Sequence, residues 1–325
     1  KITKNTKSDS VKSLNSFRLS KLFLMTQNAK KSKEYLEQAN RLKVKYPFLK
    51  DASVFYNAYS FIEKGDVEGF EKALLEANDK LKKYRNKEAY KLRAVILQNY
   101  GIMQQRKNNE NAYMKLLVNE AIPIAKRSGD YELISALNKA VAIIFMNNDE
   151  REKAAEYLDQ AQKYIESATK KSATLAESKM ETYIINAENL VELKHFYDAK
   201  EILDKAYSTL EKYPASNLND SYFYSEGIYY AKQNKHTEAL ASFEKGIKSA
   251  ANHQNGIAVN RLKFAEYEVL FKLKNYGKAK SNLEYLVENT PFIVDKKNYY
   301  KELSKVYNAT KEYPKAYFYS NKYNV

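Results

Sequence analysis

Small and aromatic residues recur along the chain in a pattern that repeats about every 40 residues. One copy contains Gly227, Tyr230, Ala239, Phe243 and Gly246, separated by steps of three, nine, four and three residues. The same steps occur in three further copies: Ala142, Phe145, Ala154, Leu158 and Ala161; Ala187, Leu190, Ala199, Leu203 and Ala206; and Tyr267, Leu270, Ala279, Leu283 and Leu286. Apolar residues at steps of three and four are typical of one face of a helix, and a fixed period of this length indicates a stacked array of helical hairpins.

The small residues of this pattern have an expected role in packing. Two helices lie about 8–10 Å apart, and they approach this closely only where Ala or Gly occupies the crossing. We therefore expect Gly227 and Ala239 at the crossing within one hairpin, and Tyr230 and Phe243 in the gaps between neighbouring hairpins. Gly inside a helix costs about 1 kcal/mol relative to Ala, so its presence there favours close approach.

Two of the predicted hairpins depart from the pattern. In the second, Phe70 replaces the small crossing residue, which leaves the distance between its two helices open. In the third, Gly101 and Ala121 are separated by one residue too many. The second helix of that hairpin also contains Pro123, which removes a backbone hydrogen bond and is expected to kink or split the helix.

The turns within the predicted hairpins carry a pattern of their own. They read Glu63-Lys64-Gly65-Asp66, Leu193-Lys194-His195-Phe196-Tyr197-Asp198-Ala199, Leu273-Lys274-Asn275-Tyr276-Gly277-Lys278-Ala279 and Lys311-Glu312-Tyr313-Pro314-Lys315-Ala316. With the small-residue spacing, these strings resemble the tetratricopeptide repeat (TPR), in which the turn between helix A and helix B ends on the small crossing residue. The resemblance covers nearly the whole chain.

This resemblance implies an all-α fold, a right-handed α-α superhelix (solenoid) of about eight TPR-like hairpins. We expect one continuous solenoid over residues 1–325, because no linker rich in Gly and Ser interrupts the chain. The eight predicted pairs of helices are residues 11–46, 51–84, 87–128, 130–168, 174–213, 219–252, 255–290 and 295–324.

Composition excludes several kinds of chemistry. The chain has no Cys, so it forms no disulfide and has no thiolate nucleophile or zinc–cysteine site. Its three His residues, His195, His236 and His253, are expected in turns or beyond helix ends and lack the spacing of a metal site. No phosphate-binding glycine loop or nucleophile motif is present. We therefore predict a protein that is not an enzyme and needs no cofactor or metal.

The net charge of +15 is unevenly distributed. Residues 1–50 contain 13 Lys and Arg against 3 Asp and Glu, and residues 260–325 contain 13 against 7. Such ends suit nucleic acid, an anionic membrane surface or an acidic partner, but Lys-rich solvated faces are the simpler explanation. No nucleic-acid-binding module is recognisable, so direct binding of nucleic acid is not expected through these residues. No apolar run of about 18 residues exists, so no membrane span is predicted in this chain.

The TPR resemblance also implies a ligand site. In that family the A helices line a concave groove that binds peptides or partner helices. The residues of this chain that match the groove are Tyr59, Gln98, Lys139, Ile184, Glu188, Tyr224, Ile228, Lys232, Arg261, Phe264, Lys272, Lys301, Lys305 and Asn308. The last three partly match the Lys and Asn clamp with which some family members hold a peptide carboxylate, and a plain basic end face is the alternative.

These inferences predict a non-catalytic domain that binds a peptide or protein segment. The chain begins at Lys1 and its last pair lacks a polar capping helix, so we expect a piece of a longer protein. It resembles the extracytoplasmic (periplasmic) repeat region of bacterial membrane-anchored regulators, which sense a ligand and control a signalling or transcription module. The alternatives are a cytoplasmic receptor of the peptide-pheromone type and a freestanding scaffold or adaptor. Pairing with a second copy, as a homodimer, stays open.

Overall fold

The computed structural model describes residues 8–169, 172–213 and 218–324, which form two compact units with a boundary between Asn148 and Asp149. Lys1 lies outside the described residues. Unit 1 contains α2 (Asp9–Met25), α3 (Ala29–Leu42), α4 (Pro47–Glu63), α5 (Val67–Leu81), α6 (Lys87–Arg106), α7 (Glu110–Leu116), α8 (Ile122–Ser128) and α9 (Tyr131–Asn147). Unit 2 contains α10 (Arg151–Ser167), α11 (Ala173–Glu192), α12 (Phe196–Lys212), α13 (Asn219–Lys232), α14 (His236–Asn252), α15 (Gly256–Lys272), α16 (Tyr276–Asn289), α17 (Ile293–Ala309) and α18 (Tyr313–Asn324).

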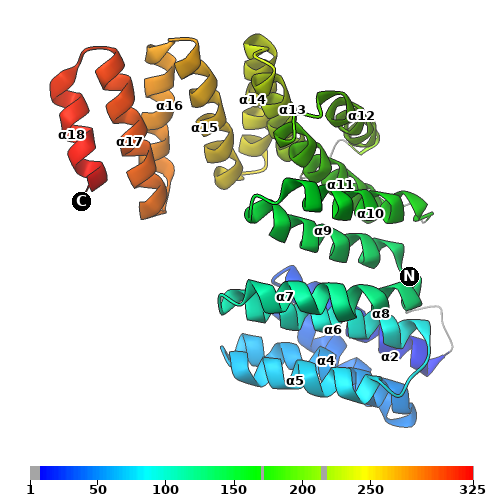
Figure 1. The fold of residues 1–325 in the computed structure, drawn as a ribbon. Coiled ribbons are helices and arrows are strands. Elements are labelled where there is room, and N and C mark those ends of the chain that lie inside the picture. Colours follow the sequence, from blue (N-terminus) through cyan, green and yellow to red (C-terminus); the bar gives the residue numbers. More distant parts are fainter. Residues whose placement is uncertain (1–7, 170–171, 214–217, 325) are drawn as a thin grey trace. The chain divides into compact units, whose positions relative to one another are not determined.

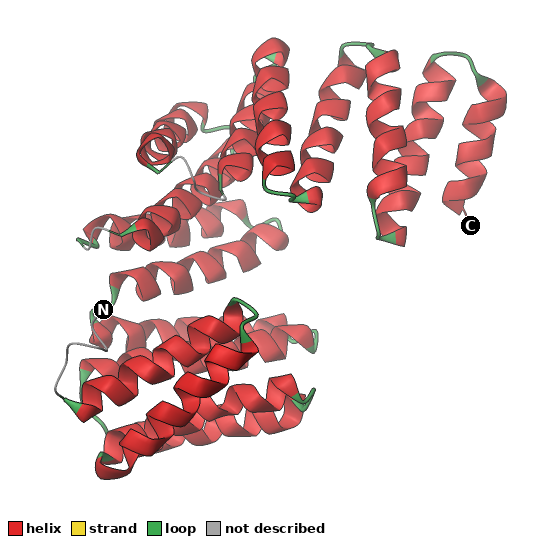
Figure 2. Ribbon diagram, turned by 180° about the vertical axis from the view of Figure 1, so that it is seen from behind, coloured by secondary structure: helices red, strands yellow, loops and turns green. Residues whose placement is uncertain are grey.

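Successive helices pack as hairpins, as the repeat pattern predicts (Figure 1). The described residues contain helices and short connections and no β-strand (Figure 2). The expected all-α fold of about eight TPR-like hairpins is confirmed. A single continuous solenoid over residues 1–325 stays a prediction. Each unit has its own buried clusters, with Phe55 and Leu74 in a cluster of unit 1 and Leu203 and Phe243 in clusters of unit 2.

The glycines of the pattern do mark close approach, but their partner differs from the one expected. A Cβ atom placed on Gly227 would lie 2.2 Å from the ring of Phe243. On Gly101 it would lie 2.2 Å from the ring of Tyr113. The glycine of helix A therefore makes room for an aromatic ring of helix B in the same hairpin. Phe243 also belongs to a buried cluster with Val259 and Leu262 of α15, so its ring packs within its own hairpin and shares a core with the next one, as expected.

Both irregular hairpins form in unit 1, where α4 packs against α5 and α6 packs against α7 and α8. Phe70 is buried and lies 5.5 Å from the ring of Tyr59, so the hairpin accepts a large side chain as part of its core. In the third hairpin a π-helical segment, Leu117–Ala121, separates α7 from α8. A π turn contains one extra residue, so it absorbs the extra residue between Gly101 and Ala121. Pro123 follows directly after this segment, in the first turn of α8. The backbone stays helical through the π segment, so the second helix has a bulge beside Pro123, and the predicted kink or split stays a prediction.

Each turn between helix A and helix B has one residue with a positive φ angle. The eight residues are Gln27, Gly65, Asn108, Asp149, Lys194, Asn234, Lys274 and Lys311. Only one of them is Gly, although this region of backbone conformation favours Gly. The turn geometry is therefore repeated along the chain even where the side chain opposes it.

Candidate ligand-binding face

In unit 2 the A helices α11, α13 and α15 lie next to one another, since α11 packs against α13 and α13 against α15. We call the surface that carries Glu188, Tyr224 and Arg261 the A-helix face. These residues are separated by 36 and 37 positions in the sequence, so the repeat brings them together rather than any local motif.

Arg261 is the centre of this face. Its guanidinium carbon lies 3.5 Å from the centroid of the Tyr224 ring, and its Nη2 donates a hydrogen bond of 3.0 Å to Oε1 of Glu188. Ser225 donates a second hydrogen bond of 2.5 Å to the same carboxylate oxygen. A planar guanidinium is suited to stack on a ring and bind a carboxylate at the same time. One side chain thus connects three successive A helices.

A second ion pair crosses the same face. Nζ of Lys232 on α13 donates a hydrogen bond of 2.8 Å to Oε2 of Glu192 on α11. Its two side chains are 46% and 39% exposed, and those of Arg261 and Glu188 are 46% and 27% exposed. Ion pairs with this exposure contribute only about 0–1 kcal/mol, so a ligand can exchange for either partner at little cost.

The other predicted groove residues on α15, Phe264 and Lys272, differ in how accessible they are. Phe264 packs 5.6 Å from the rings of both Tyr267 and Tyr299. Glu268 lies on the same helix, and burial raises the pKa of its carboxyl group, while the nearby charge of Lys272 lowers it and that of Glu302 raises it. Lys272 itself is exposed. Phe264 therefore serves packing, and Lys272 is accessible to a ligand.

The three predicted clamp residues on α17 have different neighbours. Lys305 donates a hydrogen bond of 2.7 Å to Glu302, which also accepts one of 2.7 Å from the hydroxyl of Tyr267. Nζ of Lys301 lies 5.6 Å from the centroid of the Tyr323 ring on α18, and Asn308 is exposed near the end of α17. Lys305 is thus neutralised within the helix, and the carboxylate clamp stays a prediction.

Two apolar residues of the prediction belong to the packing of unit 2. Ile184 is 4% exposed, and Ile228 is half-buried against the hydrophobic clusters. They position the polar residues that flank them along α11 and α13, and they offer a ligand little surface.

The predicted residues of unit 1 are more enclosed. Tyr59 on α4 is half-buried, and Nδ2 of Asn99 donates a hydrogen bond of 3.4 Å to its hydroxyl. Burial raises the pKa of Tyr59 to about 12. Gln98 on α6 is half-buried, and Lys139 on α9 is 8% exposed. Lys139 is therefore part of the interior of unit 1.

Sequence reasoning missed one residue of this region. Nζ of Lys21 on α2 lies 5.0 Å from the ring centroid of Phe55 and 5.3 Å from that of Tyr59. Burial lowers the pKa of Lys21 to about 8. The many lysines of residues 1–50 made it indistinguishable from solvated charge.

The three His residues lie at or beside helix ends. His195 precedes α12, His236 begins α14 and His253 ends it, where its ring Nδ1 lies 2.9 Å from the backbone oxygen of Ser249. No group of three or more His, Asp or Glu able to hold a metal ion occurs in residues 8–169, 172–213 and 218–324. Within these same ranges, every helix is too short or too polar to cross a bilayer.

Comparison with known proteins gives structural matches only. No protein-family model matches the chain, and neither does any curated protein sequence. Among solved structures, the chain resembles the apo form of RapI with a TM-score of 0.67 at 11% identity, covering 96% of each chain. It resembles a Rap protein complexed with Competence and Sporulation Factor with a TM-score of 0.55 at 15% identity, covering 98% of this chain and 87% of that one.

A third similar structure belongs to a protein that is described as containing a tetratricopeptide repeat. It is a Signal Transduction ATPase with Numerous Domains (STAND) protein with a tetratricopeptide repeat sensor, from Pyrococcus horikoshii, with a TM-score of 0.61 at 16% identity. The match covers 99% of this chain and 51% of that one. Identities this low establish a common fold and leave function open. In its fold, the chain is a TPR-like repeat protein.

Proposed function

We propose that the A-helix face of unit 2 binds a peptide or protein segment, and that the chain acts without catalysis. The arrangement of Arg261 carries this proposal. Its guanidinium is stacked on Tyr224 and hydrogen-bonded to Glu188, yet its side chain is 46% exposed. Arg held against a Tyr ring is the kind of preorganised anchor on which protein interfaces depend.

The charges on the face determine the chemistry of the ligand. α11 carries Glu188 and Glu192, and α13 and α15 carry Lys232, Arg261 and Lys272. A ligand carboxylate can take the place of Glu188 on Arg261, and a ligand Lys or Arg can then bind the carboxylate released on α11. Both exchanges replace one partly exposed ion pair with another. The ligand we propose is therefore an extended segment with acidic and basic side chains.

The structural matches support a binding role. A Rap protein of this fold is complexed with a separate factor, and the repeat region of the STAND protein is described as a sensor. We accordingly propose that the chain is the ligand-sensing or interaction region of a larger bacterial signalling or transcription-regulatory protein, on the extracytoplasmic side of a membrane. The Rap complex favours the alternative of a cytoplasmic peptide-receptor-like protein. A freestanding scaffold is the third possibility, and the parent gene on both flanks distinguishes the three.

A displayed library of random peptides, selected on the whole chain, tests the binding face. We expect selected peptides to lose about tenfold or more in affinity when Arg261→Gln removes the anchor. Tyr224→Ala is expected to have a similar effect, with circular dichroism as the check on folding. Lys248→Gln is the matched control, because Lys248 is exposed on the B helix α14. Selected peptides that bind both A-helix variants as tightly as the unaltered chain contradict the proposal.

A further inference from the structure

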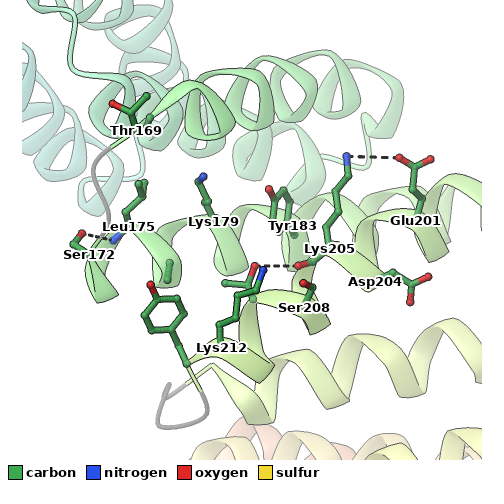
Figure 3. A pocket seen from close by; sticks show the side chains of 14 residues that line it. Thr169, Ser172, Leu175, Lys179, Tyr183, Glu201, Asp204, Lys205, Ser208 and Lys212 are labelled. Carbon is green, nitrogen blue, oxygen red and sulfur yellow. Dashed lines mark hydrogen bonds and ion pairs between the residues drawn. The ribbon is translucent and has the colours of Figure 1, made fainter.

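A pocket of about 890 Å³ lies in unit 2 between α11 and α12, beside the end of α10 (Figure 3). α11 contributes Leu175, Lys179 and Tyr183 to its lining, and α12 contributes Lys205 and Lys212. A volume of several hundred Å³ is typical of sites for small molecules. The pocket is open to solvent on one side, so a ligand can enter without a change in the fold.

This pocket is separate from the A-helix face. Successive residues of an α-helix are rotated by about 100°, so Lys179 and Glu188, nine positions apart, project from opposite sides of α11. Glu188 binds Arg261 on α15, whereas Tyr183 of the pocket donates a hydrogen bond of 3.2 Å to Glu166 on α10. A ligand in the pocket and a segment on the A-helix face therefore do not compete for the same side chains.

Three acidic groups beside the pocket share two lysines. Asp204 forms an ion pair with Lys200. Lys205 lies 3.6 Å from Glu201, an ion pair drawn in Figure 3, and 3.5 Å from Glu166. Each of these acids thus has a lysine within 4.0 Å, and no group of three or more His, Asp or Glu able to hold a metal ion is found here or elsewhere in the described residues.

Two lysines of the lining, in contrast, are left without an acidic partner. Neither Lys179 nor Lys212 has a carboxylate within 4.0 Å among residues 8–169, 172–213 and 218–324. They belong to different helices, α11 and α12 (Figure 3). Two unpaired ammonium groups at one cavity favour an anion there, because a charge-assisted hydrogen bond is stronger than a neutral one.

The rest of the lining combines hydroxyl groups with an apolar surface. Thr169, Ser208 and Tyr213 supply hydroxyl groups that can donate to an anion, and the ring of Tyr213, which is 39% exposed, supplies apolar surface. An inorganic ion would leave this apolar surface uncovered. An organic molecule with a carboxylate or phosphate group uses both parts of the lining.

We propose that this pocket binds a small organic anion, with its acidic group held by Lys179 and Lys212 and its carbon skeleton against the ring of Tyr213. The site is additional to peptide binding on the A-helix face and does not depend on it. Carboxylates and phosphate esters share the chemistry that these lysines recognise, so the test includes one of each.

Isothermal titration calorimetry on the whole chain at low salt tests this site with citrate, glycerol 3-phosphate and inorganic phosphate as probes. We expect at least one organic anion to bind with a Kd below about 1 mM, and more tightly than inorganic phosphate. Lys179→Gln and Lys212→Gln are each expected to weaken that binding about tenfold, as the loss of one charge-assisted hydrogen bond predicts. Lys248→Gln is again the matched control and should bind as the unaltered chain does.

A second measurement avoids dependence on the variants. Lysine acetylation with acetic anhydride, read by mass spectrometry, should be slower at Lys179 and Lys212 when the bound anion is present, and unchanged at Lys248. The proposal is overturned if neither organic anion binds at about 10 mM, a concentration that detects even millimolar affinity. It is also overturned if inorganic phosphate binds as tightly, or if the variants bind normally and both lysines stay unprotected. Peptide binding by the A-helix face is unaffected by any of these outcomes.

Discussion

In unit 1, Lys21 of α2 lies over the rings of Phe55 and Tyr59 on the next A helix, and no ion pair to a carboxylate is found for it among the described residues. In unit 2, Arg261 of α15 lies over the ring of Tyr224 on the preceding A helix and also binds Glu188. Both units thus place a cation on a tyrosine between adjacent A helices. Only in unit 2 is that cation neutralised, and only there is it exposed enough to serve a ligand.

The hairpins of the two units also differ in the helix that faces the glycine of helix A and in the residue at the turn. Gly227 faces Phe243 of an uninterrupted helix B, whereas Gly101 faces Tyr113 of a helix B that a π-helical segment divides. The turn of unit 1 at Gly65 has glycine where the turn of unit 2 at Lys274 has a side chain. The same architecture therefore tolerates different side chains, and matched substitutions in the two units show what each difference costs.

The largest effect is expected from Gly227→Ala. The added Cβ would lie 2.2 Å from the Phe243 ring, so overpacking should destabilise the fold by about 2–3 kcal/mol in urea denaturation. Gly101→Ala should cost less, about 1–2 kcal/mol, because the divided helix can shift away. Phe243→Leu, added to Gly227→Ala, should recover part of the loss. A neutral Gly227→Ala, or a double variant with additive losses, contradicts this account of the contact.

Lys21→Met tests the unpaired cation. Burial lowers the pKa of Lys21 from 10.5 to about 8, so the unfolded chain binds more protons than the folded one between these values. Folding stability linked to Lys21 therefore rises as the pH rises from about 8 to 10. Replacing Lys21 with Met should remove this rise and stabilise the protein by about 1–2 kcal/mol at pH 7.

Denaturation of both proteins at pH 7, 8, 9 and 10 measures the difference. Arg261→Met in unit 2 is the control, and it should show no such gain, because removing Arg261 leaves the charge of Glu188 without its ion-pair partner. Parallel pH profiles for the unaltered chain and Lys21→Met would show that Lys21 is solvated in the folded state.

The turns should give effects of about 1 kcal/mol with opposite signs. Gly65→Ala places a side chain at a φ of 73° and should destabilise unit 1 by about 1 kcal/mol. Lys274→Gly removes a side chain at a φ of 58° and should stabilise unit 2 by up to about 1 kcal/mol. Thermal unfolding measures both. Equal signs would mean that the conformation of the turn does not limit stability in these two hairpins.

The smallest effects are expected from the exposed ion pairs. Glu188→Gln in unit 2 and Glu88→Gln in unit 1, where Arg18 binds both carboxylate oxygens at 2.7 Å, should each cost less than about 1 kcal/mol. The loss should shrink at 1 M NaCl, where the screening length is about 3 Å. A larger, salt-independent loss for Glu188→Gln would show that Glu188 holds the A helices together and cannot be given up to a ligand.

The repeat was predictable because small residues and rings recur at steps that a helical hairpin imposes wherever it occurs. The irregularity of the third hairpin was also predictable. The spacing shows one extra residue between Gly101 and Ala121, and a helix must accommodate it locally, here in a π-helical segment. The repeat register assigned Glu188, Tyr224, Lys232 and Arg261 to the groove side of successive A helices, and that they bind a ligand stays a prediction.

The sequence by itself thus determined the helices, their pairing and the turns between them, because these depend on contacts within one repeat. Only the tertiary structure decided that Arg261 joins Tyr224 and Glu188, that Lys21 lies unpaired on two rings, and that Lys179 and Lys212 share a pocket. Whether a charged side chain is solvated, paired or isolated depends on residues that neighbouring helices bring within a few ångströms, and one-dimensional spacing does not contain those distances.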